Sequence, residues 1–393
     1  MIKLNEIIDV KNCTYNWDKI KEIQEFAVLE NCEQNPEWHS EGNSFIHTQL
    51  VCQSASTRAK NETMTDKERL IFLASALFHD IGKGVSTFCG KDGKWHAYGH
   101  EIEGERITRY LLWDEGIEIR EAICGLVRYH MDILNAYGKR SYMEILTELS
   151  NAVYSMKMLI MLKECDIMGS KPQNKEQTDY DFLRMIELSE ACRVMNIYEN
   201  SNEISYHRHW GIDRHFKHFE EYKKIKNKPY ISVCVLIGLP GAGKSTAIKN
   251  LIEEQTLMYD ITERSLPEFR IISRDIIRAE LGYCKEGEKI IGTTEQEETV
   301  TEVFNAQILD AAKNGENIVI DNMNTKRKYR TAYRELLSDY RVFWSYIYVE
   351  ANGIEKNIER RKGQIAEEKF ADMIRSIDWP TRDEYCTFKI MTN

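Results

Sequence analysis

Residues 230–250 read YISVCVLIGLPGAGKSTAIKN, and this stretch indicates the fold of the C-terminal part of the chain. The apolar run SVCVLI leads into GLPGAGKS, which fits the phosphate-loop pattern GxxxxGK[ST] without a mismatch. The residues that follow, STAIKNLIEE, are typical of a helix. Because a strand before the glycines and a helix after them are the context in which this pattern binds phosphate, we predict a nucleotide site here.

The phosphate loop works through its backbone and through two side chains. Glycines allow successive N–H groups to turn towards phosphate oxygens, and the start of the helix adds positive potential. Lys244 is expected to reach the β- and γ-phosphates, and the Ser245 hydroxyl is expected to bind Mg²⁺. The predicted nucleotide-binding residues are Gly238, Gly241, Ala242, Gly243, Lys244, Ser245 and Thr246.

The sequence around the loop alternates short β-branched runs with helical patterns. The runs cover residues 231–237, 269–273, 317–321, 342–349 and 387–391. Such alternation predicts a parallel sheet covered by helices, and hence an α/β domain.

Charged residues follow the predicted strands. Asp275 lies in SRDIIR just after the second run, and Asp321 ends the third. That edge of an open α/β sheet faces the ligand crevice, so Asp275 can accept the proton of an attacking hydroxyl, and Asp321 can hold Mg²⁺ or orient the acceptor. Arg278 shares a helical face with Asp275 and can orient the acceptor or bind phosphate. A helix cap and a solvated charge are the alternative interpretation of this pair.

Two basic clusters occur later in the chain. The first, at a helix start on the ligand edge, is Lys326, Arg327, Lys328 and Arg330. Its position favours contact with a polyphosphate or a nucleic-acid backbone over an ordinary solvated face. The second, Arg360 and Arg361 in ERRKG, predicts a mobile helical lid whose arginine meets the transferring phosphoryl group, with an ordinary basic helix end as the alternative.

Residues 1–200 carry helical patterns. Apolar residues recur at three- and four-residue spacing in 67–78, 101–113, 118–130 and 142–165, and no convincing alternating strand occurs. We therefore predict two domains of different class, an all-α domain followed by the α/β domain. Their predicted bounds are 1–228, with a core at 40–170 and a connecting segment rich in His and aromatic residues at 199–228, and 229–393.

Histidines and aspartates recur through the helical half. The set consists of His47, His79, Asp80, His100, His130 and Asp166. Imidazole and carboxylate groups suit two divalent cations close together, and a carboxylate such as Asp80 can bridge them. Two such cations lower the pKa of a bound water and neutralise an attacked phosphate. Each of these residues alone is better explained as a core or cap residue, but six in this order on helices indicate a site.

Composition sets limits on the functional class. The chain has 393 residues, a net charge of −10, 42% hydrophobic and 30% charged residues, which fits a globular enzyme and argues against a broad electrostatic grip on nucleic acid. Ten single cysteines without a CxxC pair favour reduced thiols and a cytoplasmic location. No signal peptide and no run of 18 apolar residues occurs, so we expect no membrane segment.

The C-terminal motifs, taken together, resemble the polynucleotide 5′-hydroxyl kinase family. The resemblance covers about 160 residues and rests on GLPGAGKST, SRDIIR, NIVIDNMN and ERRKG, with Met323 in place of the small polar residue expected there. It implies transfer of a phosphoryl group from ATP or another nucleoside triphosphate, with Mg²⁺, to a 5′-OH of RNA or DNA. In that family pattern Asp275 is the general base, Arg278 engages the acceptor phosphate, Asp321 positions the acceptor, and Arg360 or Arg361 clamps the donor.

The N-terminal motifs resemble the HD phosphohydrolase superfamily. HDIGKG, GHEIEG and VRYHMDIL look most like the HD module attached to bacterial tRNA nucleotidyltransferases, whose catalytic domain is absent from this chain. The resemblance makes His47, His79, Asp80 and Asp166 ligands of one metal, and Asp80, His100 and His130 ligands of a second. The implied metals are transition ions such as Mn²⁺, Ni²⁺ or Co²⁺. Lys83 is then a phosphate contact, and His96 is a weaker competitor of His100.

The two halves together resemble bacterial bifunctional end-healing enzymes. The implied function is the repair of broken RNA or DNA, in which one half removes 2′,3′-cyclic, 2′ or 3′ phosphates and the other phosphorylates 5′-OH ends for a downstream RNA ligase. One alternative is a second-messenger hydrolase fused to a small-molecule kinase. Another is a non-catalytic, nucleotide-gated RNA-binding module. The cluster His207, His209, His215 and His218 is expected to serve packing between domains, with RNA or metal binding as the alternative.

Overall fold

The structure is a computed structural model of the whole chain, and it describes residues 1–134, 142–198, 227–228, 230–251, 269–285, 292–362 and 364–393. The chain divides into two compact units, Met1–Ser205 and Tyr206–Asn393. The predicted connecting segment and the four histidines in it lie outside the described residues, apart from residues 227–228. The predicted domain boundary at 228 adjoins that segment and stays a prediction.

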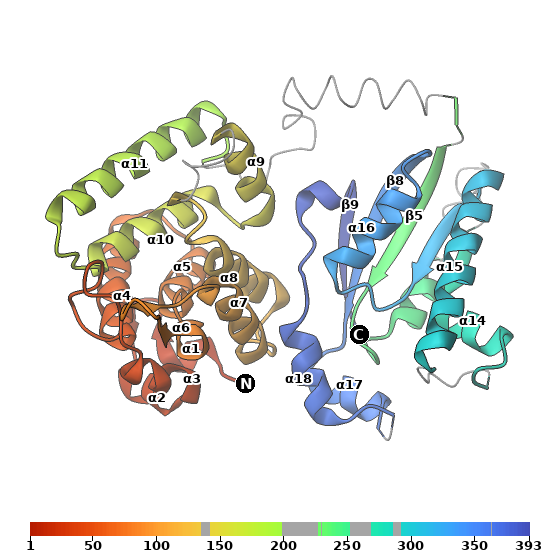
Figure 1. Cartoon of the computed structure of the whole chain (residues 1–393), viewed down its shortest axis with the longest axis horizontal. Coiled ribbons are helices and arrows are strands. Elements are labelled where there is room, and N and C mark those ends of the chain that lie inside the picture. Colours follow the sequence, from red (N-terminus) through yellow and green to blue (C-terminus); the bar gives the residue numbers. More distant parts are fainter. Residues whose placement is uncertain (135–141, 199–226, 229, 252–268, 286–291, 363) are drawn as a thin grey trace. The chain divides into compact units, whose positions relative to one another are not determined.

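The first unit is helical (Figure 1). Its helical segments are α1 Leu4–Ile7, α2 Trp17–Glu22, α3 Gln24–Ala27, η1 Val28–Asn31, α4 Ser44–Asn61, α5 Asp66–Phe78, α6 Lys83–Ser86, α7 His100–Leu111, α8 Ile117–Tyr129, α9 Tyr142–Ala152, α10 Met156–Gly169 and α11 Lys175–Val194. Two short antiparallel pairs, which the sequence patterns do not predict, join Ile8–Asp9 (β1) to Thr14–Tyr15 (β2) and Phe88–Cys89 (β3) to Trp95–His96 (β4).

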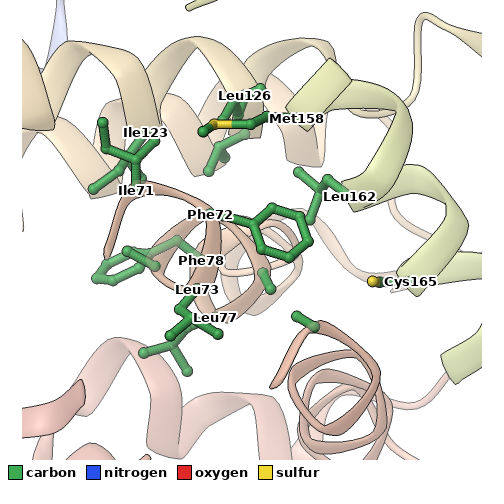
Figure 2. Packing of buried hydrophobic residues seen from close by; sticks show 14 of the residues in the cluster. Ile71, Phe72, Leu73, Leu77, Phe78, Ile123, Leu126, Met158, Leu162 and Cys165 are labelled. Carbon is green, nitrogen blue, oxygen red and sulfur yellow. The ribbon is translucent and has the colours of Figure 1, made fainter. Parts of the chain in front are cut away.

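Helix α5 forms the centre of this unit. Thr65 and Glu68 form a capping box at its start, which satisfies N–H groups that the first turn leaves without partners. Every residue from Ile71 to Phe78 is buried, as expected for a helix that is covered on all sides. Helices α8 and α10 pack against it, and Figure 2 shows Phe72 facing Leu162 of α10. The core therefore fixes the C-terminal end of α5, where His79 and Asp80 follow.

The predicted helical run 142–165 is two helices in the structure. Helix α9 ends at Ala152, and α10 begins at Met156 with Ser155 as its N-cap, the Ser155 side chain accepting a hydrogen bond from the Met158 N–H. A serine that captures a backbone N–H offers the chain an alternative to continuing the helix.

The second unit is built on a parallel sheet of five strands in the order β6-β7-β5-β8-β9. The strands are β5 Tyr230–Ile237, β6 Phe269–Ser273, β7 Asn317–Asp321, β8 Arg341–Glu350 and β9 Thr387–Thr392. The helical segments are α14 Arg274–Glu280, α15 Thr294–Asn314, α16 Arg327–Leu336, α17 Ile354–Arg360, α18 Glu367–Arg375 and η3 Arg382–Glu384, and residues 244–251 are also helical. Helix α15 packs against β6 and β7 (Figure 1). The prediction of an α/β domain after a helical domain is confirmed.

Strand β5 lies at the centre of the sheet and leads into the phosphate loop. It pairs with β7 on one side and β8 on the other, and its residues from Val233 to Ile237 are buried, as expected for a central parallel strand. In register, Ser273 of β6 faces Asp321 of β7, and Asp321 faces Leu236 of β5. The sheet therefore brings the ends of three strands to the edge at which the loop begins.

Candidate functional site

The predicted histidine and aspartate set gathers at one place in the helical unit. His47 comes from α4, His79 and Asp80 follow α5, His100 begins α7, His130 follows α8, and Asp166 lies on α10. Two groups of these residues, His47–His79–Asp80 and Asp80–His100–His130, each have possible ligand atoms within 4.8 Å of one another. Asp80 belongs to both groups, so the arrangement can hold two cations that share one carboxylate.

The backbone fixes the tautomer of three of these histidines. The Nδ1 atoms of His79, His100 and His130 lie 2.9, 2.8 and 2.8 Å from the carbonyl oxygens of the third residue before each histidine. Since a carbonyl only accepts, each Nδ1 carries the proton and each Nε2 offers a lone pair. His79 and His130 use carbonyls near helix C-termini, which have no partner within the helix.

Their Nε2 atoms point at carboxylate oxygens. Asp80 Oδ1 lies 3.2 Å from His100 Nε2 and 3.8 Å from His130 Nε2, and Asp80 Oδ2 lies 3.2 Å from His79 Nε2. The Nε2 atoms of His100 and His130 are buried and have no hydrogen-bond partner among the described residues. Buried lone pairs that face a carboxylate need a positive charge between them. The residues therefore fit divalent cations.

His47 is held at both ring nitrogens. Its Nδ1 is 2.9 Å from Glu41 Oε1, and its Nε2 is 3.0 Å from Asp166 Oδ1. Burial opposes its charged form, but the hydrogen bonds to Asp166 and Glu41 raise the pKa of His47 to about 9. Burial also lowers the pKa of His130, together with the neighbouring His100 and His79, which keeps its imidazole neutral. Neutral imidazole is the form that binds metal, so a cation held by His47 would displace the proton that Asp166 and Glu41 stabilise on its ring.

Two lysines balance the carboxylates. Lys83 Nζ lies 2.6 Å from Asp80 Oδ2 and donates to Gln34 Oε1 at 2.8 Å, while Lys163 Nζ donates to Asp166 Oδ2 at 2.6 Å. Burial disfavours the charged carboxylates, yet these cations and the nearby histidines hold the pKa values of Asp80 and Asp166 well below the usual range. Both lysines line the cleft that leads to the centre, where they can also meet an anionic substrate.

Sequence patterns do not predict three of these partners. Glu41, Gln34 and Lys163 each contact a predicted site residue from outside the recognised motifs. Only Lys163 carries a local signal, because it lies three residues before Asp166 on one helical face. His96, the weaker competitor of His100, lies on β4 and contacts Asp92 at 3.1 Å, and it belongs to neither ligand group that contains Asp80.

The phosphate loop lies at the predicted edge of the sheet. Its carbonyl oxygens accept hydrogen bonds from side chains, namely from Lys244 to Gly238 and Leu239, from Asn357 to Pro240, from Arg360 to Gly241 and from Asn393 to Ala242. Gly241 and Gly243 have φ values of +77° and +100°, which favour glycine. Gly238 is also restricted, because a Cβ there would lie 2.3 Å from the Val349 carbonyl oxygen. The loop is thus held in shape by contacts to its outward carbonyls.

The acidic residues predicted beside the loop lie at the same edge. Asp321 Oδ2 accepts a hydrogen bond from Ser273 Oγ at 3.2 Å, and Asp275 lies in the first turn of α14. Arg278 donates to Asp275 at 2.7 Å and to both oxygens of Glu297 at 2.7 and 2.8 Å. The hydrogen bond from Arg278 lowers the pKa of Glu297 to about 2, although burial opposes that shift. Glu297 is a further partner that the sequence patterns do not predict.

The two predicted arginines of the lid differ in their contacts. Arg360 ends α17 and donates to the Gly241 carbonyl of the phosphate loop at 2.8 Å, whereas Arg361 donates to Gln364 at 3.0 Å. The interpretation of Arg330 as part of a surface for phosphate is wrong. Its side chain is fully buried and pairs with Glu384 at 2.7 Å, so it holds α16 to the η3 segment instead.

Family comparisons agree with this division. Residues 45–162 match the HD domain family, and residues 233–380 match the AAA domain family. The chain joins an HD domain to a P-loop domain. HD domains bind divalent metals, and a P-loop domain implies a nucleotide with Mg²⁺. Among the described residues, no helix combines the length and apolar character needed to cross a membrane.

Curated relatives match part of the chain. A Multifunctional CCA protein of Pasteurella multocida (strain Pm70) is 29% identical over 166 residues, which is 40% of this chain and 37% of that protein. A Multifunctional CCA protein of Actinobacillus pleuropneumoniae serotype 5b (strain L20) is 38% identical over 87 residues, 22% of this chain and 20% of that protein. The chain therefore spans 37% of the length of the first relative and 20% of the length of the second.

Solved structures show only distant similarity. The Pnkp1/Rnl/Hen1 RNA repair complex matches with 18% identity and a TM-score of 0.28, covering 38% of this chain and 45% of that chain. The Chaetomium thermophilum Kti12 complex with ADP-AlF3 matches with 16% identity and a TM-score of 0.28, covering 41% of this chain and 88% of that chain. TM-scores this low assign no activity.

Proposed function

We propose that this chain heals the ends of broken RNA, its HD domain clearing phosphate from the 2′,3′ end and its P-loop domain adding phosphate to the 5′ end. The observation that carries the proposal is the presence, in one chain, of a buried His/Asp centre suited to two cations and a phosphate loop with Asp275 and Asp321 at its sheet edge. Hydrolysis at one centre and transfer at the other are the two reactions that a ligase requires before it can join a break.

At the HD centre, the chain's own residues supply binding and orientation. Divalent transition ions such as Mn²⁺, Ni²⁺ or Co²⁺, when bound, lower the pKa of a water and neutralise phosphate charge. His47, His79, Asp80 and Asp166 would hold one ion, and Asp80, His100 and His130 the other. Lys83 and Lys163 place positive charge along the cleft wall, where a terminal phosphate can exchange for their present carboxylate contacts.

At the P-loop, ATP or another nucleoside triphosphate would bind with its phosphates against residues 238–246. Lys244, which donates to two carbonyls of its own loop, would turn to the β- and γ-phosphates, and Ser245 would face Mg²⁺. Asp275 would accept the proton of the 5′-OH as that oxygen attacks the γ-phosphorus. Asp321 would position the acceptor. Arg278 would give up its hydrogen bonds to Glu297 and contact the phosphate of the acceptor strand.

The charge of the molecule favours recognition of RNA ends over recognition of long duplexes. The chain has a net charge of −10, so a long nucleic-acid backbone would gain little electrostatic attraction from it. Among the described residues, Lys83 and Lys163 lie at the His/Asp centre and Lys244 lies in the phosphate loop, where each can meet a single phosphate.

One RNA substrate tests the proposal. It carries a 2′,3′-cyclic phosphate at one end and a 5′-OH at the other, and it is incubated with the whole chain, ATP, Mg²⁺ and Mn²⁺. The expected product has a 2′,3′-diol and a 5′ phosphate. If the RNA ends stay unchanged while the chain hydrolyses a cyclic dinucleotide or phosphorylates a small metabolite, end healing is wrong. The small-molecule alternative then takes its place.

A further inference from the structure

The cleft that leads to the His/Asp centre has an aromatic rim. We use this term for Trp38, Trp95, His96 and Tyr98, which line the cleft together with Asp80, His100 and Asp166. The cleft has a volume of about 810 Å³, which is within the roughly 300–1,000 Å³ common for ligand sites. Ring surface and metal-type ligands therefore line one cavity large enough for a nucleotide.

Three of the four rim residues are exposed, and His96 is half-buried. Tyr98 is 73% exposed, Trp38 50% and Trp95 37%. Tyr98 stacks on His96 with ring centroids 5.1 Å apart and an angle of 18°, and the Phe88 ring lies 5.7 Å from His96 and 5.9 Å from Tyr98. Several large rings kept at a surface beside a cleft, instead of in the core, indicate a binding site. A supported ring with an exposed face is suited to stacking on another flat ring.

The backbone ties this rim to the centre. The β3–β4 hairpin carries Trp95 and His96, and the chain passes through Tyr98 directly to His100 at the start of α7. His100 Nδ1 donates to the Ala97 carbonyl at 2.8 Å, which fixes this short connection. The same turn therefore sets the position of the Tyr98 ring and the orientation of the His100 imidazole.

The charged side chains beside the rim already have contacts. Lys94 Nζ pairs with Glu37 at 2.7 Å, and His96 contacts both oxygens of Asp92 at 3.1 Å. The rim itself therefore offers aromatic surface, whereas the lysines that can meet a phosphate, Lys83 and Lys163, lie beside the His/Asp centre. This separation favours a ligand that has a neutral flat ring at one end and a phosphate at the other.

We infer that the aromatic rim is a nucleobase subsite, which stacks the base of the nucleotide whose phosphate enters the His/Asp centre. The inference rests on the proposed function, because it takes the phosphate-bearing terminal nucleotide as the ligand. Every base has an aromatic face, so stacking of this kind requires a base without selecting one. The HD domain should accept different terminal bases but discriminate against phosphate esters that have none.

Binding to the whole chain, measured by calorimetry with and without Mn²⁺, tests the subsite directly. The probes are adenosine 3′-monophosphate, uridine 3′-monophosphate and glycerol 2-phosphate, which lacks a base. Stacking is worth roughly 1–3 kcal/mol per base, so both nucleotides should bind at least about fivefold more tightly than the base-free ester. Tyr98→Ala, and to a similar extent Trp38→Ala, should remove this advantage and leave the affinity for glycerol 2-phosphate unchanged.

A matched control and a kinetic measurement separate the subsite from damage to the fold. Tyr180 on α11 is 56% exposed and is absent from the cleft lining, so Tyr180→Ala should bind all three probes like the wild type. In hydrolysis of an RNA 2′,3′-cyclic phosphate, Tyr98→Ala should raise KM with little change in kcat. Tyr98→Phe should restore the wild-type KM, because the ring is what stacks.

The outcomes distinguish this inference from the proposed function. Wild-type affinity for nucleotides in Tyr98→Ala and Trp38→Ala, or an equal loss for all three probes, would overturn the subsite even if RNA ends are healed. A base-dependent affinity that Tyr98→Ala abolishes, found in a chain that does not hydrolyse RNA ends, would support the subsite and overturn end healing.

Discussion

In the proposed function, the His/Asp centre and the phosphate loop both hold phosphate, but they are made from different parts of the chain. The centre is made from side chains of residues between 41 and 166, brought together by the packing of α4, α5, α7, α8 and α10. The loop is made mainly from the backbone of nine consecutive residues, 238–246. The His/Asp centre therefore depends on tertiary packing and on the identity of its side chains, whereas the phosphate loop depends on local backbone geometry.

Removal of metal should separate the two sites most strongly. After treatment with a chelator, hydrolysis of a 2′,3′-cyclic phosphate should fall by on the order of 10³-fold or more, because the ions supply several kcal/mol of charge stabilisation. Mn²⁺, Ni²⁺ or Co²⁺ should restore it, since imidazole-rich sites suit transition metals. Mg²⁺ alone should restore only the transfer of phosphate to a 5′-OH, and rescue of both reactions by Mg²⁺ alone would remove the distinction between the sites.

A glycine substitution should break the loop and spare the centre. Gly243 has a φ of +100°, and a Cβ there would lie 2.6 Å from the Asn393 side chain. Gly282 has a φ of +74° with open space at its Cβ position, so alanine strains the backbone at both glycines but crowds a neighbour only at Gly243. Strain of this kind costs about 1–3 kcal/mol. Gly243→Ala should weaken ATP binding by about 10- to 100-fold in a calorimetric titration, because the strain distorts the phosphate cradle.

The control for that experiment is Gly282→Ala, which lies outside the loop. It should also lower the melting temperature, because it strains the backbone at a positive φ, while ATP binds normally. Equal loss of ATP affinity in both variants would mean that general destabilisation, and not the loop, sets the affinity.

The Glu41 carboxylate, which contacts His47, should raise the affinity of the His/Asp centre for metal. Glu41 is fully shielded from solvent and accepts a hydrogen bond from His47 Nδ1 at 2.9 Å, so it fixes the ring and strengthens its Nε2 as a ligand. Glu41→Gln should lower the affinity for Mn²⁺ by about 10- to 100-fold, measured by calorimetry on the whole chain.

Glu30→Gln removes a similar charge from the exposed pair with Lys21 and should leave the Mn²⁺ affinity unchanged. If both variants bind Mn²⁺ like the wild type, Glu41 has no positioning role.

The smallest expected effect distinguishes the two arginines after α17. Arg360 contacts the Gly241 carbonyl, whereas Arg361 contacts Gln364. Arg360→Ala should raise the KM for ATP by about 3- to 10-fold, as expected for one charged hydrogen bond at an exposed position. Arg361→Ala should have a weaker effect in the same steady-state assay, and the reverse order would assign the donor contact to Arg361.

The fold is predictable to the extent that local patterns determine it. The strands of the parallel sheet lie within one residue of the predicted runs, because buried parallel strands are apolar throughout and end in turn signals. The short β1–β2 and β3–β4 pairs escape prediction, since strands of two residues are too short to show alternation. The break near Ser155 coincides with the N-cap of α10, which the continuous apolar periodicity of residues 142–165 does not reveal.

The candidate site is predictable in its ligands and not in their partners. Histidines and aspartates in a characteristic order point to the centre, and the structure gathers them. Glu41 and Gln34 contact it from loops whose positions depend on the whole fold, so no spacing rule identifies them. The burial of Arg330 shows the same limit, because its partner Glu384 lies 54 residues away in the sequence.

We propose that two independent sites act on opposite ends of one break. An experiment with one variant at each site tests this directly. An RNA with a 2′,3′-cyclic phosphate and a 5′-OH is treated with Asp80→Ala, with Asp275→Ala and with a mixture of both. We expect that Asp80→Ala phosphorylates the 5′ end only, that Asp275→Ala opens and removes the cyclic phosphate only, and that the mixture heals both ends. Loss of both reactions in either single variant, in protein that remains folded, would contradict it.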